Sequence, residues 1–300
     1  MMSSVKVECV VKASALIGEG PVWEESEQTL LFVDIAGQKI HRWSPMTNQI
    51  QSVETGDTVG FAVPCRSGGY AAGVGRSIVA VDWSTQKMTS LVEVDEDKPN
   101  NRLNDGKVDP IGRLLAGTMG KERRPAEVQK QQGSLFSVTS DLTVTKHLSQ
   151  VDISNGLDWS LDQKTFFYID TLSLTVDAFD YDSNTGQLGN RRMVYRMEEG
   201  EGFPDGMTVD AEGRLWVACY NGGRVINIDP ATGLRLQTVS LPVMKTTSCC
   251  FGGPDYSDLY VTSASLGLDH SESRQQPLAG HIFRVRGLGV KGRPSNSFSG

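Results

Sequence analysis

Four short segments of the chain place an oxygen-bearing side chain directly before a glycine. The residues in this polar position are Glu19, Asp105, Asn155 and Asp205. Carboxylate and amide oxygens, without histidine or cysteine, form the donor set that hard divalent cations such as Ca²⁺, Mg²⁺ and Mn²⁺ prefer. Carboxylates gathered at one point would repel one another unless a cation neutralised them. The pattern therefore predicts a metal site, provided that the fold brings these distant segments together.

The glycines of these segments recur at a regular spacing. They are Gly20, Gly60, Gly106, Gly156 and Gly206, with separations of 40, 46, 50 and 50 residues, and the copy at Gly60 has an apolar residue in the polar position. A period of this size is typical of a repeat architecture. In a β-propeller, equivalent residues of the blades meet around one central axis. The spacing thus predicts that the four polar residues converge.

A plainer interpretation is that each polar residue only makes a turn, because Asn-Gly and Asp-Gly are common turn dipeptides. Glu19 weakens this interpretation, since Glu-Gly is a poor turn pair. The shared register of all four residues weakens it further. We therefore favour the metal site.

Each repeat also shows the strand pattern of a propeller blade. A short apolar strand follows the anchor glycine, and a polar turn, a β-rich apolar run and an alternating strand come next, as at residues 206–229. Gly, Pro, Asn and Asp at the turns supply the backbone angles that hairpins require. Three or four short strands per repeat, without helical periodicity, are typical of a blade.

The sixth repeat lacks an outermost strand at the C-terminal end, and residues 5–11 could supply it by pairing with the last blade, which would close the ring. We therefore predict an all-β fold, a six-bladed β-propeller that forms a single domain over residues 1–300. Residues 292–300 are expected to form a loose tail.

Composition excludes several classes of protein. The chain is 38 % hydrophobic and 22 % charged, which is ordinary for a soluble globular protein. No apolar run approaches the roughly 18 residues of a membrane span, and the N-terminus lacks the apolar core of a signal peptide. A net charge of −7 argues against a nucleic-acid surface. We expect a cytoplasmic protein without nucleic-acid or membrane partners, and a monomer, although the sequence carries no direct signal of oligomeric state.

The five cysteines are Cys9, Cys65, Cys219, Cys249 and Cys250. Their number is odd, and their spacing suggests no zinc site. We expect buried free thiols in a reducing compartment.

Two polar features lie close to the anchor Asp105. Arg102 and Asn104 alternate on one face of the same strand, so both could point toward whatever lies above the metal, although an ordinary surface strand would look the same. The third repeat also carries a long polar insertion between Thr118 and Gly133. Long loops on a rigid scaffold often carry function, and a solvated charged loop is the alternative.

Several longer motifs resemble the senescence marker protein branch of the gluconolactonase family. They are GEGPVW at 18–23, NRLNDGK at 101–107, DISNGLDWS at 152–160, PDGM at 204–207, WVACYNGG at 216–223 and KTTSCCFGG at 245–253. The resemblance covers essentially the whole chain. It implies a six-bladed propeller with one catalytic divalent metal ion (Ca²⁺, Mg²⁺, Mn²⁺ or Zn²⁺) held by Glu19, Asn155 and Asp205.

The resemblance also implies that Arg102, Asn104 and Glu122 contact a sugar lactone. Asp105 is then expected to be a second-layer or axial residue. The implied reaction is hydrolysis of an aldonolactone to an aldonic acid, with a metal-polarised carbonyl and Asp205 as general base.

Two other functions remain open. The first is a calcium-binding regulatory protein or buffer, for which the substrate contacts would serve no purpose. The second is an esterase or organophosphate hydrolase, as in related propellers. Fold alone does not decide between them, because function resides in the site.

Overall fold

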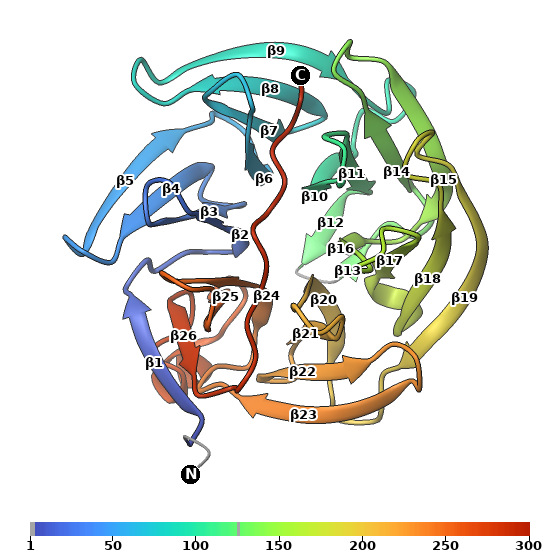
Figure 1. Cartoon of the computed structure of the whole chain (residues 1–300). Helices are drawn as coiled ribbons and strands as arrows, with labels where there is room; N and C mark the ends of the chain where they lie inside the picture. Colours follow the sequence, from blue (N-terminus) through green and yellow to red (C-terminus); the bar gives the residue numbers. More distant parts are fainter. Residues whose placement is uncertain (1–3, 125–126) are drawn as a thin grey trace.

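The computed structural model describes residues 4–124 and 127–300. Its main strands form six four-stranded sheets, which stand like blades around a central axis (Figure 1). The inner strands of the blades contact one another around this axis. The predicted all-β, six-bladed propeller is confirmed.

The sheets follow the chain in order, and each is described here from its inner strand outward. The first blade contains β2 (Gly18–Glu24), β3 (Thr29–Asp34), β4 (Lys39–Ser44) and β5 (Gln49–Glu54). The second contains β6 (Val59–Pro64), β7 (Tyr70–Val74), β8 (Ser77–Asp82) and β9 (Lys87–Glu93). The third contains β10 (Arg102–Val108), β11 (Leu114–Met119), β14 (Gly133–Val138) and β15 (Val144–Val151).

The remaining blades continue this pattern. The fourth contains β16 (Ser154–Trp159), β17 (Thr165–Asp170), β18 (Thr175–Tyr181) and β19 (Leu188–Arg196). The fifth contains β20 (Phe203–Val209), β21 (Leu215–Tyr220), β22 (Arg224–Asp229) and β23 (Leu234–Ser240). The sixth contains β24 (Thr246–Gly252), β25 (Asp258–Ser263), β26 (Ile282–Arg286) and the N-terminal strand β1 (Lys6–Val11), which pairs antiparallel with β26.

Every inner strand carries a register shift in its pairing with the second strand of its blade. The shifts lie between Glu19 and Val22, Val59 and Phe61, Leu103 and Asp105, Ser154 and Leu157, Pro204 and Met207, and Thr246 and Ser248. A β-bulge takes a residue out of the ladder and changes the direction of its side chain. The bulges therefore fall at or beside the anchor positions that the sequence repeat marks.

The anchor glycines allow the inner strands to approach one another. A Cβ atom at Gly156 would lie 2.7 Å from the carbonyl oxygen of Asp205, and one at Gly206 would lie 2.7 Å from Cα of Ser248. Both glycines lie inside strands, not in turns. The turn interpretation is therefore wrong for these two anchors, and close packing at the axis explains the glycine.

The prediction of a loose C-terminal tail is wrong. Residues 287–300 form a strap that runs from the sixth blade across the axis toward the second and third blades (Figure 1). Phe298 is 0 % exposed and packs in the apolar cluster that contains Phe61. Its backbone N–H donates to Pro64 O at 2.8 Å, and its carbonyl accepts from Arg66 N at 2.8 Å. Burying a phenylalanine side chain contributes about 1.5–3 kcal/mol, which holds this end of the chain in place.

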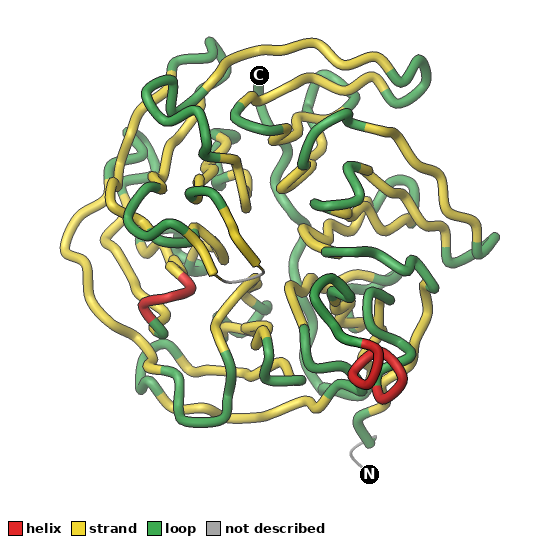
Figure 2. The backbone as a smooth tube through the Cα atoms, turned by 180° about the vertical axis from the view of Figure 1, so that it is seen from behind, coloured by secondary structure: helices red, strands yellow, loops and turns green. Residues whose placement is uncertain are grey.

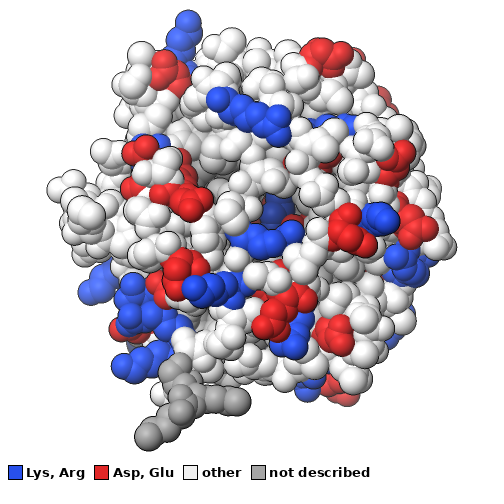
Figure 3. All heavy atoms as spheres, in the orientation of Figure 1, with Lys and Arg blue, Asp and Glu red and all other residues white. Residues whose placement is uncertain are grey.

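Acidic and basic side chains are interspersed over the face that the strap crosses (Figure 3). Figure 2 shows the opposite face, where the two short helical segments η1 (Thr171–Ser173) and α1 (His270–Gln275) lie. The third-repeat insertion forms a two-stranded sheet of β12 (Glu122–Arg124) and β13 (Glu127–Val128). Within the described residues, no helix has the length and apolar character needed to cross a membrane.

Candidate metal centre and substrate pocket

A pocket of about 490 Å³, including its open mouth, lies at the axis on the side away from the strap. All six residues that the sequence assigned to the site line it: Glu19, Arg102, Asn104, Glu122, Asn155 and Asp205. They come from four inner strands, β2, β10, β16 and β20, and from the inserted strand β12. The fold thus brings the predicted set together, while the role of each residue stays a prediction.

The three proposed metal ligands lie on three different inner strands. Glu19 is on β2, Asn155 on β16 and Asp205 on β20, and their relative exposures are only 4 %, 4 % and 8 %. Asn155 and Asp205 stand within a bulge of their blades, and Glu19 is the last paired residue before one. Bulges at or beside equivalent positions therefore position all three side chains at the axis.

Burial and neighbouring charges disfavour the charged forms of the Glu19 and Asp205 carboxyl groups. Glu19 and Asp205 line the same pocket, and burial raises the pKa of both. The charges of Asp205 and Asp105 raise the pKa of Glu19 further, and the charge of Asp105 has the same effect on the pKa of Asp205. A cation would favour the charged forms of both groups, because an opposite charge at close range offsets desolvation.

Asn155 completes a donor set that fits such a cation. Its Nδ2 donates to Thr171 Oγ1 at 2.8 Å, whereas its buried Oδ1 has no hydrogen-bond partner among the described residues. No group of three or more His, Cys, Asp or Glu side chains placed to hold a metal occurs in the described part of the chain, so this centre would combine two carboxylates with an amide. Such oxygen ligands suit hard divalent ions.

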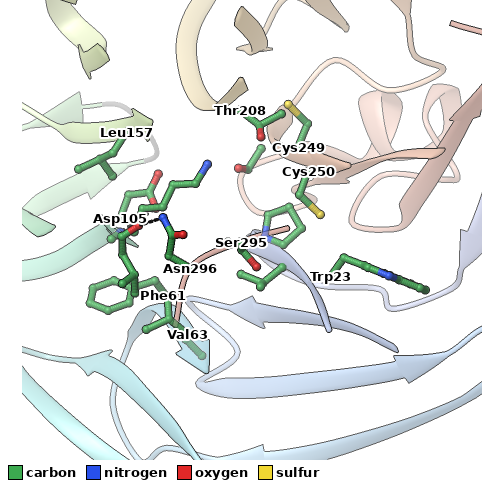
Figure 4. A pocket seen from close by; sticks show the side chains of 18 of the residues that line it. Trp23, Phe61, Val63, Asp105, Leu157, Thr208, Cys249, Cys250, Ser295 and Asn296 are labelled. Atoms are coloured by element: carbon green, nitrogen blue, oxygen red, sulfur yellow. Dashed lines mark hydrogen bonds between the residues drawn. The ribbon is translucent and has the colours of Figure 1, made fainter. Parts of the chain in front are cut away.

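Asp105 does not line this pocket, although its charge acts on the carboxyl groups of both Glu19 and Asp205, and its expected second-layer or axial role stays a prediction. Asp105 lines a cavity of about 710 Å³ on the strap side of the inner strands, together with Asn296 of the strap (Figure 4). Its Oδ1 accepts from Gly106 N at 2.7 Å, and burial raises its pKa to about 7. Asn104, one residue earlier on the same strand, lines the metal pocket, so the two neighbouring residues line different cavities.

The polar residues beside the ligands form a hydrogen-bonded arc. Arg102 donates through Nη1 to Asn104 Oδ1 at 2.8 Å and through Nη2 to Glu122 Oε2 at 3.1 Å. Asn104 in turn donates through Nδ2 to Ser154 O at 2.8 Å. The arc therefore connects the β12 strand of the insertion with the inner strand β10 and with the residue before Asn155.

The residues of the pocket wall were not predicted from the sequence. Four wall residues end or directly follow the second strand of a blade: Ile35, Met119, Thr171 and Tyr220. Two more, Ile17 and Ile153, stand two residues before an anchor. The repeat register itself contained this signal, since equivalent positions of different blades lie around the same axis.

Comparison with known proteins agrees with this architecture. Residues 17–265 match the model of the SMP-30/gluconolactonase/LRE-like region. Regucalcin of Xenopus laevis is 59 % identical over 299 residues, which cover 100 % of each chain. The structure of a luciferin-regenerating enzyme superposes with a TM-score of 0.93 at 36 % identity, covering 99 % of this chain and 100 % of that one.

The structure of a calcium-binding protein, regucalcin, from Agrobacterium tumefaciens gives a TM-score of 0.89 at 28 % identity and covers 96 % of each chain. The resemblance indicated by the sequence motifs is confirmed. The chain belongs to the SMP-30/gluconolactonase/LRE-like family.

Proposed function

We propose that residues 1–300 form a single-domain, divalent-metal-dependent lactonase that hydrolyses aldonolactones to aldonic acids. The observation that carries the proposal is the buried Oδ1 of Asn155, which has no hydrogen-bond partner among the described residues and lies in one pocket with the carboxyl groups of Glu19 and Asp205. A polar arc for a hydroxylated substrate lines the same pocket. Membership of a family named for gluconolactonase supports the choice of substrate class.

Glu19, Asn155 and Asp205 would hold one ion, which could be Ca²⁺, Mg²⁺, Mn²⁺ or Zn²⁺. When bound, such an ion supplies a Lewis acid that stabilises negative charge on the lactone carbonyl oxygen. The remaining chemistry belongs to side chains of this chain.

Asp205 would act as the general base. Its carboxylate accepts a proton as a water oxygen bonds to the carbonyl carbon, and the ring C–O bond then breaks. The proton passes to the ring oxygen, which leaves as a hydroxyl group, so atoms and charge balance. Asp205 lines the same pocket as the proposed substrate contacts, so its carboxylate lies in the site where this water would be held.

Arg102, Asn104 and Glu122 would orient the sugar ring. A guanidinium donates hydrogen bonds and a carboxylate accepts them, so the Arg102–Glu122 pair suits neighbouring hydroxyl groups that both donate and accept. Holding the ring in one orientation converts binding energy into positioning at the carbonyl carbon. The apolar side chains of Ile17, Ile35 and Met119 enclose the same pocket.

A calcium-binding protein without catalysis is the second candidate. The oxygen-only donor set favours it, and one relative of known structure is described as a calcium-binding protein. The Arg102–Glu122–Asn104 arc argues for catalysis, since a simple ion site does not need it. A propeller esterase or organophosphate hydrolase would use the same donors with a different substrate.

The deciding experiment measures hydrolysis of gluconolactone, other sugar lactones and an organophosphate ester in the presence of each of the four metals, and in excess chelator. We expect metal-dependent turnover that prefers sugar lactones. Calcium binding without turnover of any lactone would favour the calcium-binding candidate. A preference for the organophosphate would favour an esterase or organophosphate hydrolase.

A further inference from the structure

The Asn155 amide can bind a cation in only one of its two orientations, unlike the two carboxylate ligands. A carboxylate offers two equivalent acceptor oxygens, whereas an amide offers one oxygen and one NH₂ group that only donates. Rotating the Asn155 amide by half a turn would present hydrogens to a cation. A metal centre that uses this residue therefore needs something that fixes the amide.

Thr171 supplies a contact that distinguishes the two orientations. Its Oγ1 donates to the carbonyl oxygen of Pro204 at 2.9 Å, which uses the single hydroxyl hydrogen. Toward Asn155 the same oxygen can only accept, and it accepts from Nδ2 at 2.8 Å. A rotated amide would place Oδ1 against an oxygen with no hydrogen left to give, so the observed orientation is favoured.

The position of Thr171 is itself well fixed. Thr171 is 4 % exposed, and its backbone N–H donates to the carbonyl oxygen of Ile153 at 3.1 Å. Ile153 stands two residues before Asn155. Pro204 directly precedes Asp205 on the next inner strand. One hydroxyl group therefore connects the strand of one proposed ligand to the strand of another.

Packing does not explain why this residue is polar. In three other blades the residue that ends or follows the second strand and lines the pocket is Ile35, Met119 or Tyr220. An apolar or aromatic side chain thus serves as pocket wall at this repeat position. The fourth blade has a hydroxyl group there, and it is the blade that carries the amide ligand.

We propose that Thr171 is a positioning residue, which holds the Asn155 amide with Oδ1 toward the metal and ties it to the segment that carries Asp205. The inference rests on the metal centre of the proposed function. Partners of this kind, one layer outside the ligands, typically change metal affinity by about 10- to 100-fold when they are removed.

The test compares Thr171→Val, which keeps the shape but removes the hydroxyl group, with Thr171→Ser, which keeps the hydroxyl group. The dissociation constant for Mn²⁺ is measured by titration calorimetry, and the Tm of the metal-free protein is measured beside it. Thr246→Val is the matched control, because the buried Thr246 hydroxyl donates to Cys219 O at 2.6 Å and lies outside the metal pocket. Thr171→Ala replaces the valine variant if that variant does not fold.

We expect Thr171→Val to weaken Mn²⁺ binding by roughly 10- to 100-fold, Thr171→Ser to bind nearly as the unmodified protein does, and Thr246→Val to lower Tm without weakening Mn²⁺ binding. Unchanged Mn²⁺ affinity in Thr171→Val, or an equal loss in Thr171→Ser, would overturn the role of Thr171. Failure of the unmodified protein to bind Mn²⁺ would instead contradict the metal centre itself, so the two failures are distinguishable.

Discussion

The guanidinium of Arg102 lies 3.1 Å from the carboxylate of Glu122, which connects the axial strand β10 to the inserted strand β12 at the pocket mouth. Both side chains are partly buried, at 16 % and 26 % exposure. Because neither residue belongs to the proposed ligand set, this pair allows substrate binding to be tested separately from metal binding.

Replacing Glu122 by alanine should raise KM for a sugar lactone by roughly 10- to 100-fold, since a hydrogen bond to a charged group contributes about 1.5–3 kcal/mol. The affinity for Mn²⁺ should change little. Glu127→Ala is the control, because Glu127 lies in the same inserted sheet but outside the pocket. A KM equal to that of the control would remove Glu122 from the substrate site.

Asp205→Asn should separate the two roles proposed for Asp205. Asparagine keeps one ligand oxygen but cannot accept a proton at neutral pH. Metal binding should weaken, and kcat at saturating metal should fall by about 10²- to 10⁴-fold. Occupancy is checked by calorimetry. A metal-saturated variant with near-normal kcat would leave Asp205 as a ligand only.

Stabilisation by metal should increase with pH. Burial and neighbouring carboxylates raise the pKa of Glu19 and Asp205 above their values in the unfolded chain, which are near 4. Without metal, the folded protein therefore holds more protons than the unfolded chain, and the free energy of unfolding falls as pH rises through the raised pKa values. A cation binds the deprotonated pair and removes this loss.

The measurement is the difference in Tm with and without Mn²⁺ between about pH 5 and pH 8. Calorimetry in two buffers of different ionisation enthalpy should also detect proton release on binding. A Tm difference that is constant over this range, without proton release, would argue that no raised carboxyl pKa is linked to metal binding.

The C-terminal strap should contribute substantially to stability. Phe298→Ala should lower the free energy of unfolding by about 3–5 kcal/mol, because it empties a fully buried aromatic site. Ser299→Ala is a neighbouring control that removes one hydroxyl hydrogen bond to Gly112 O. Denaturant unfolding measures both variants, and equal stability of the two would show that the strap does not depend on its phenylalanine.

Much of the fold could be predicted from the sequence repeat, because every blade is a four-stranded sheet. The anchor spacing predicted blades around one axis, and the family resemblance implied the set Glu19, Asn155 and Asp205, which line one pocket. Asn104 and Asp105 line different cavities, and the sequence pattern does not fix the place of the register shift beside them. The strap was missed because Phe298 is a lone apolar residue among Gly, Ser and Pro, so its burial depends on a cavity that distant blades provide.

Anomalous diffraction from crystals grown with Mn²⁺ tests the central claim most directly. The account predicts one strong peak at the axis, within bonding distance of Glu19, Asp205 and the Oδ1 atom of Asn155. A peak in the strap-side cavity beside Asp105, or no peak at the three ligands in protein that still hydrolyses lactone, would contradict it.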